Sequence, residues 1–197
     1  CPKLAPVIDE FLVKLKAFES QLGSEYIDSF NRIELKKGEY LFRSGKIAKD
    51  IWILDQGIAR TTVEHDGKED TIGLYFGTEI IELYSSSTLR IPSIFNIQML
   101  TDAVVYSISW KKINQLKELN PIIHEIEKLM VACHVHYMDN RLLELQTLSA
   151  KDRLENLQKN RPDMMKHIKR SVLASYLGIE IETLSRISKP GGNQKSL

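Results

Sequence analysis

Five polar side chains near the C-terminal end are spaced to lie on one face of a helix, and the first four have the types that can read the edges of DNA bases. They recur at helical intervals: Glu182, Thr183, Ser185, Arg186 and Lys189. Arg186 can donate two hydrogen bonds to guanine, Glu182 can accept one from cytosine, and Ser185 is a short adaptable partner. A Glu182–Arg186 ion pair across one helical turn is the simpler interpretation. Both can hold, because such a pair would order Arg186 for a base contact.

Phosphate contacts are expected beside this face. The residues expected to make them are Lys169, Arg170, Ser171 and Lys189. The first three begin a helix, where free N–H groups and the helix dipole favour an anion. Residues 148–197 carry 10 Lys+Arg against 5 Asp+Glu, whereas residues 1–147 carry 17 against 21. A basic end on a mildly acidic body is consistent with a polyanion at that end.

Residues 170–189 have the pattern of two short crossed helices, a helix-turn-helix. The apolar positions that would bury the two helices against each other are Leu173, Leu177, Ile179, Leu184 and Ile187. Ala174 is small where the helices approach, and Gly178 permits the left-handed turn between them. Glu180 departs from the Ser, Thr or Asp that usually caps such a second helix. An ordinary helical hairpin is the alternative, and the agreement of every other position favours the DNA-binding motif.

A long helix over residues 122–147 is expected to join two copies of the chain. One of its faces carries residues at alternating steps of four and three: Ile122, Ile126, Leu129, Cys133, His136, Asn140 and Leu143. Such a heptad seam needs a partner, and an identical helix from a second chain is the simplest one. The alternative is that the helix packs on the β domain of its own chain.

Short strand-like runs separated by glycine precede this helix. The expected strands cover residues 33–35, 40–42, 50–54, 58–63, 70–75, 94–100 and 104–108. This spacing is typical of an antiparallel sandwich or barrel, and Asp66-Gly67 predicts a tight hairpin. Helices are expected over residues 6–30, 110–119 and 150–159, the last capped by Ser149, and a short hairpin before Ile168.

The composition is that of an ordinary globular chain, with 43% apolar and 27% charged residues. No apolar run approaches the length of a membrane span, so no membrane partner is expected. Two cysteines, Cys1 and Cys133, cannot form a disulfide framework or a four-thiolate cluster, and they suit a reducing, cytoplasmic location. The first residue is Cys1 rather than Met, so we expect the native start to lie upstream.

The sequence carries no enzyme signature. A cupin-like metal enzyme needs His-x-His on a strand, whereas His65 stands alone and His134 and His136 lie on the long helix. Walker, nucleophile-elbow and HExxH motifs are absent. Cys133 beside these histidines suggests a metal, but further ligands are lacking. We therefore expect no catalytic residue, no metal and no cofactor.

The order of β-roll, long helix and basic helix-turn-helix resembles the Crp/Fnr superfamily of bacterial transcription regulators. In the first part the resemblance is carried by residues 37–42, Gly45, residues 51–54, Gly57 and residues 59–60. These are similar to the opening of a cyclic-nucleotide-binding fold. In the last part, residues 182–186 match the E-x-x-S-R recognition helix of the Fnr branch, and residues 176–179 are similar to regulators from Bacteroidetes.

The resemblance implies an α+β protein in three parts. Residues 1–119 would be a cyclic-nucleotide-binding-like β-roll, 120–147 a dimerisation helix and 148–197 a C-terminal winged helix-turn-helix. It implies a homodimer that binds palindromic double-stranded DNA, with half-sites akin to TTGAT, and contacts RNA polymerase under control of an effector at the β-roll. The alternatives are a β-roll module that binds a ligand or partner protein without DNA, and, less favoured, a cupin-like metal enzyme.

The effector pocket that the resemblance implies departs from the cyclic-AMP pattern. Its residues would be Gly77, Ile81, Glu82, Arg90 and Ser93. Cyclic-AMP binders carry a Gly-Glu pair that fixes the ribose and an Arg-Ser or Arg-Ala pair that neutralises the cyclic phosphate. Here Ile81 replaces the glycine and Arg90 is displaced from its pair. Cyclic AMP is therefore not the expected effector.

Overall fold

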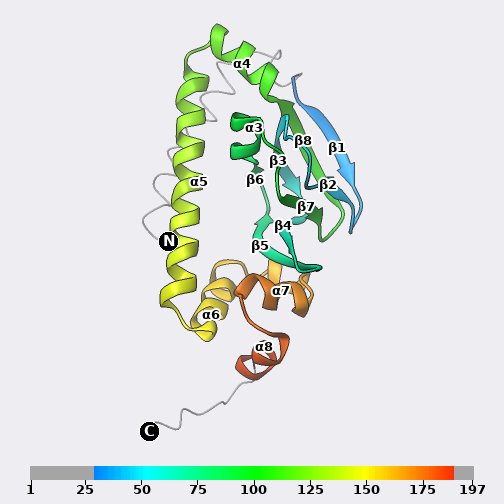
Figure 1. Cartoon of the computed structure of the whole chain (residues 1–197), viewed down its shortest axis with the longest axis vertical. Coiled ribbons are helices and arrows are strands. Elements are labelled where there is room, and N and C mark those ends of the chain that lie inside the picture. The colour runs from blue at the N-terminus through cyan, green and yellow to red at the C-terminus, as the bar shows by residue number, and fades with distance from the viewer. Residues whose placement is uncertain (1–28, 189–197) are drawn as a thin grey trace.

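The computed structural model describes residues 29–188 (Figure 1). The helix expected over residues 6–30 lies outside this range apart from its last two residues, as do Cys1 and Lys189. Within the range, strands dominate up to Ser109 and helices follow. The predicted α+β class, with a β-rich first part and C-terminal helices, is confirmed.

Eight strands of the described part form two antiparallel sheets that face each other as a roll. Their bounds are β1 (Asn31–Leu35), β2 (Tyr40–Phe42), β3 (Asp50–Gln56), β4 (Ile58–His65), β5 (Lys68–Phe76), β6 (Glu79–Ile81), β7 (Phe95–Met99) and β8 (Ala103–Ser109). One sheet has the order β1-β8-β3-β6, the other β2-β7-β4-β5. Alternate residues of facing strands, such as Trp52 and Leu54 on β3 and Ile97 and Met99 on β7, fill the core between the sheets.

The seven expected strands are confirmed, and two elements were not predicted. These are β6 and the short helix α3 (Tyr84–Leu89). No side chain caps the N-terminus of α3. Instead Ser86 ties the helix to the roll, because its Oγ accepts from the Ala48 N–H at 3.0 Å and donates to the Ile91 carbonyl at 2.6 Å. Ala48 lies 38 residues away, so a local pattern could not reveal this contact.

The tight hairpin between β4 and β5 is confirmed. His65 pairs with Lys68, and both central residues have positive φ, 51° for Asp66 and 72° for Gly67. These are the angles of a two-residue turn whose twist matches that of the strands.

The helices that follow begin and end close to the predicted residues. They are α4 (Trp110–Leu119), α5 (Ile122–Thr147) and α6 (Ala150–Asn160). Ser149 caps α6 as predicted, accepting from the Asp152 N–H at 3.2 Å. The hairpin expected before Ile168 is wrong: a single 3₁₀ turn, η1 (Met164–Lys166), takes its place. This turn buries Met164 in a cluster with Leu74 of the roll.

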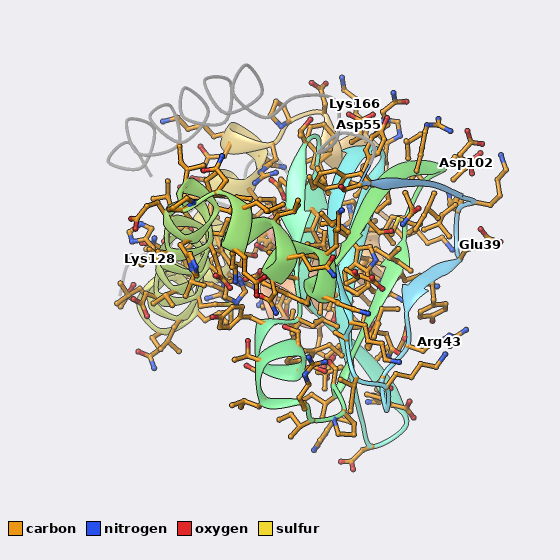
Figure 2. All side chains as sticks on the ribbon, turned by 90° about the horizontal axis from the view of Figure 1, so that it is seen from above. Glu39, Arg43, Asp55, Asp102, Lys128 and Lys166 are labelled. Carbon is orange, nitrogen blue, oxygen red and sulfur yellow. The ribbon has the colours of Figure 1, made fainter. Side chains whose placement is uncertain are left out.

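The long helix α5 lies along one side of the roll, next to β6 and α3 (Figure 1). Ile123, and beside it Met130, pack in a cluster with Ile51, Ile108 and Trp110. Seen from above, Lys128 of α5 lies at the opposite side of the molecule from Glu39, Arg43 and Asp102 of the roll (Figure 2). The α5 helix therefore packs on the β domain of its own chain. This was the alternative to a helix that pairs only with a second chain.

Candidate nucleic-acid interface and effector site

The predicted helix-turn-helix is formed by α7 (Arg170–Leu177) and α8 (Ile181–Ile187). All five predicted apolar positions lie in one cluster, in which Leu177 and Leu184 are at most 1% exposed and Leu154 of α6 takes part. Gly178 ends α7 in the left-handed conformation, with φ of 68°. A side chain there would be strained and would also contact Leu145. Glu180 precedes α8 without a capping side-chain bond, which agrees with its departure from the usual cap residues.

A hollow of about 450 Å³ opens on the outer side of α8. It is lined by Arg170, Ile181, Glu182, Ser185 and Arg186. Within residues 29–188, Glu182 and Arg186 do not form the ion pair considered above, so both charges face the hollow without neutralising each other. Arg170 donates to Ser185 Oγ at 3.2 Å. The hollow therefore presents donors and one carboxylate acceptor, the mixture that reading base edges needs.

The remaining predicted DNA contacts are placed differently. Thr183 is half-buried and does not line the hollow. Lys169 and Ser171 are exposed at the start of α7, beside Arg170. Lys189 follows the last described residue.

The sequence did not reveal that α7 also packs on the roll. Its second face buries Val172 and Tyr176 in a cluster with Ile58, Leu74 and Met164. The Thr71 N–H donates to Ser175 Oγ at 2.8 Å, across 104 residues of sequence. Nearby, Arg161 forms an ion pair with Glu79 of β6. The helix-turn-helix is thus fixed against β4 and β5, with α8 turned away from the sheets (Figure 1).

A buried arginine ties the same unit to α5. Arg141 is 9% exposed, and it donates to the Tyr176 carbonyl while its guanidinium carbon lies 4.1 Å from the centre of the Tyr176 ring. Arg153 of α6 donates to the carbonyls of Leu177 and Leu148, at 2.9 and 2.7 Å. A charge can be buried only with such partners, so these two arginines fix the angle between α5, α6 and α7.

The predicted effector residues do not converge on one anion site. Ile81 is fully buried in the core of the roll, and Ser93 Oγ accepts from the Phe95 N–H. Arg90 is exposed at the left-handed end of α3, and Gly77 follows β5 at a bend where an added Cβ would meet no other atom within 4 Å. No arginine–hydroxyl pair for a cyclic phosphate is formed by these residues.

Glu82 is the one member of this set with an unusual environment. It is buried, and neither carboxylate oxygen has a hydrogen-bond partner in the described part of the chain. Burial, with a smaller contribution from the charge of Glu127, raises the pKa of Glu82 to about 7. Trp110 Nε1 is likewise buried without a partner, and Glu127 pairs with Lys117. The carboxyl of Glu82, which lies near enough to α5 for the charge of Glu127 to act on it, could therefore accept a hydrogen bond from an added donor.

Metal ligands do not gather in the described residues: no group of three or more His, Cys, Asp or Glu is placed to hold an ion. Burial raises the pKa of the Cys133 thiol and lowers the pKa of His134, and His136 Nε2 is buried without a partner among residues 29–188. No helix in residues 29–188 has the length and apolar character to cross a membrane.

Comparisons with known proteins agree with this fold. Residues 32–120 match the family model of the cyclic nucleotide-binding domain. The chain is similar to the transcriptional activator protein anr of Pseudomonas aeruginosa, with 25% identity over 185 residues, which cover 84% of this chain and 74% of the relative. It is similar to the transcriptional activator protein FnrA of Stutzerimonas stutzeri, with 27% identity over 167 residues, 78% of this chain and 67% of the relative.

Solved structures share the architecture at lower identity. FixK2 from Bradyrhizobium japonicum has a TM-score of 0.67 at 17% identity, over 80% of this chain and 82% of that one. The c-di-GMP-responsive global regulator CLP of Xanthomonas campestris has a TM-score of 0.66 at 16% identity, over 83% and 87%. Fold and matches together define a cyclic nucleotide-binding domain followed by a helical C-terminal part. The two curated relatives to which the chain is similar along most of its length are transcriptional activators.

The buried carboxyl of Glu82 gives a pH-dependent stability. Its folded pKa of about 7 exceeds the ordinary 4.5, so the folded state binds the extra proton between these values. The free energy of unfolding should therefore fall as pH rises from about 4.5 to 7. Glu82→Gln removes this titration and should be more stable than wild type at pH 8, by up to about 3 kcal/mol, with little difference at pH 4.5.

Urea unfolding of both chains at several pH values measures this difference. Glu34→Gln is the matched control, because Arg32 lowers the pKa of that exposed carboxyl and its loss should give no gain at pH 8. A stability difference between Glu82→Gln and wild type that is constant with pH would contradict the buried, unpaired state of Glu82.

Proposed function

We propose that the chain is a DNA-binding transcription regulator of the Crp/Fnr type that works in the cytoplasm on promoter DNA and contacts RNA polymerase. The observation that carries this proposal is the exposed face of α8, where Glu182, Ser185 and Arg186 surround a hollow on a well-packed helix-turn-helix. Homology to named transcription activators supports it. The proposed parts are the β-roll to residue 119, the helix 120–147 and the DNA-binding unit 148–197.

Each side chain of this face has a proposed partner in the half-site. Arg186 donates to guanine, Glu182 accepts from the paired or a neighbouring cytosine, and Ser185 contacts thymine or adenine. Lys169, Arg170 and Ser171 meet phosphates from the start of α7, with Lys189 beyond α8. Thr183, being half-buried, is the least exposed of the proposed base-reading residues.

Arg186→Ala should cut affinity for an inverted repeat of TTGAT-like half-sites by about 10- to 10⁴-fold, because each lost bidentate contact costs roughly 1–3 kcal/mol and a dimer loses two. Its binding to scrambled DNA should hardly change. Lys169→Ala should weaken all sequences alike and reduce the salt slope by about one unit. Titrations on matched and scrambled palindromes at two salt concentrations compare the two variants, and equal behaviour would rule out α8 as the recognition helix.

A palindromic site requires a dimer, and we propose that α5 forms it. Successive residues of a helix are about 100° apart, so residues at steps of three and four form a line along one face. Three such lines, each shifted by one residue, run along α5. The line through Ile123, Met130 and Arg141 packs on the rest of the chain. The predicted seam lies one residue before it: Ile122, Ile126 and Leu129 line an open groove of about 310 Å³, and Leu143 is exposed.

The second flank lies one residue after the packed line and carries four exposed apolar side chains. They are Val135, Met138, Leu142 and Leu145, again at alternating steps of three and four. Exposed apolar residues at this spacing are typical of helix pairing. The heptad pattern alone does not choose between the two flanks.

Two charge substitutions test the dimer and locate its seam. Leu129→Asp buries an unpaired charge if the predicted seam is correct, and Leu142→Asp does so if the second flank pairs. Light scattering should show a dimeric wild type at micromolar concentration, with one of the two variants monomeric. Circular dichroism controls for folding, and a monomeric wild type would contradict the dimer.

We propose that the effector of the roll is not cyclic AMP. Ile81 fills the place of the glycine that admits a ribose, and Arg90 is exposed away from any partner hydroxyl in the described residues. A cyclic phosphate would enter without a paired cation.

Cyclic AMP at millimolar concentration should therefore leave the melting temperature and the DNA affinity unchanged. A ligand at a hundredfold excess over its Kd would add about 2.7 kcal/mol to the free energy of unfolding. Thermal unfolding with cyclic AMP, with AMP as the control, measures this. A rise of several degrees with cyclic AMP alone would show that the roll binds it.

A further inference from the structure

The side chain of Arg170 connects the two helices of the DNA-binding unit across the hollow. It is the first residue of α7, and its guanidinium donates to Ser185 Oγ on α8 at 3.2 Å. Both residues are exposed and line the hollow together with Glu182 and Arg186. Among the described residues, Arg170 has no carboxylate partner, and the Ser185 hydroxyl accepts the hydrogen bond of its side chain.

The contact sets the polarity of the Ser185 hydroxyl. A serine hydroxyl has one proton to donate and two lone pairs that accept, whereas an arginine only donates. Arg170 therefore takes a lone pair of Ser185 Oγ, and its positive charge turns the hydroxyl proton away. In this arrangement the proton of Ser185 is available to a third group.

Two other hydroxyls at helix ends in the described structure donate their proton to the backbone. Ser188 Oγ donates to the Leu184 carbonyl at 2.6 Å, and Thr147 Oγ1 donates to the Leu143 carbonyl at 2.7 Å. This bond to the carbonyl four residues earlier is the usual one for Ser and Thr in helices. Ser185, in the described structure, does not bond to the carbonyl of Ile181 and instead accepts from Arg170.

We propose that Arg170 is a specificity-determining positioning residue, which makes Ser185 a hydrogen-bond donor and so selects an acceptor edge at one base pair of each half-site. Thymine offers the O4 acceptor and guanine the O6 and N7 acceptors, whereas cytosine offers an amino donor and adenine places an amino donor beside its N7 acceptor, where that donor would face the nearby guanidinium. Of the two bases proposed above for Ser185, thymine is thus selected over adenine. This inference rests on the proposed DNA-binding function and adds a second role for Arg170 beside phosphate contact.

The test is a base-preference profile. Affinities are measured for palindromes that carry each of the four base pairs at each half-site position, with wild type, Arg170→Met, Ser185→Ala and the double variant. The position read by Ser185 is the one whose preference Ser185→Ala removes. There, wild type should prefer thymine over adenine and cytosine by about 5- to 10-fold per half-site, the size of one hydrogen bond.

Arg170→Met should reduce that preference to within about 2-fold and leave the guanine preference due to Arg186 intact. On the Ser185→Ala background it should change no preference. Lys169→Met is the matched control, because this neighbouring cation makes no hydrogen bond or ion pair with α8 in the described structure. It should lower affinity on all sequences equally. Thermal unfolding checks that each variant is folded.

The outcomes separate this inference from the proposed function. An Arg170→Met variant that loses affinity equally on every sequence is a phosphate contact only, and this overturns the inference while specific binding through Arg186 stands. A wild type that prefers adenine at the Ser185 position overturns it as well. A wild type without any sequence preference overturns both the inference and the proposed function.

Discussion

The packing of α7 on β5 is the contact on which the position of α8, the proposed recognition helix, depends. Five of the eight residues of α7 are buried: Val172, Leu173, Ala174, Tyr176 and Leu177. Leu173, Ala174 and Leu177 pack on α6 and α8, while Val172 and Tyr176 pack on the roll. A helix that is apolar on two sides must be covered on two sides. Once both are covered, α8 has only its outer face left to meet another molecule.

Arg141 extends this constraint to α5. Removing the partners of a buried guanidinium leaves an uncompensated charge, which is among the costliest changes in a protein interior. Arg141 has Glu144 as an ion-pair partner within α5, at 3.9 Å, but it keeps its contacts with the carbonyl and the ring of Tyr176 only while Tyr176 stays against α5. The proposed dimer helix and the proposed DNA-binding unit are therefore held in one orientation by Arg141 together with Arg153, and in a dimer that orientation would set the distance between the two copies of α8.

The sequence predicted those elements whose signals are local. Alternation and glycine turns located seven strands, Asp66-Gly67 located the hairpin, and the apolar spacing with Gly178 located α7 and α8. Where the stabilising partner is distant, prediction failed: α3 depends on the Ala48–Ser86 bond, and the η1 turn depends on Met164 reaching the roll. One sequence signal does point to the packing of α7 on the roll: Val172 and Tyr176 are large side chains on α7 that the crossing with α8 does not require.

For the candidate sites the limit was the choice of face rather than the choice of residues. Three lines on α5 share steps of three and four, so periodicity places residues on a line without telling which line meets a second chain. At α8 the ambiguity concerned the Ser185 hydroxyl, which can donate or accept a hydrogen bond. The residue types made Ser185 an acceptor or a donor, and Arg170, fifteen positions earlier, decides between them through one hydrogen bond. Base selection at such a position belongs to a pair of side chains from two helices, and a motif confined to one helix cannot contain it.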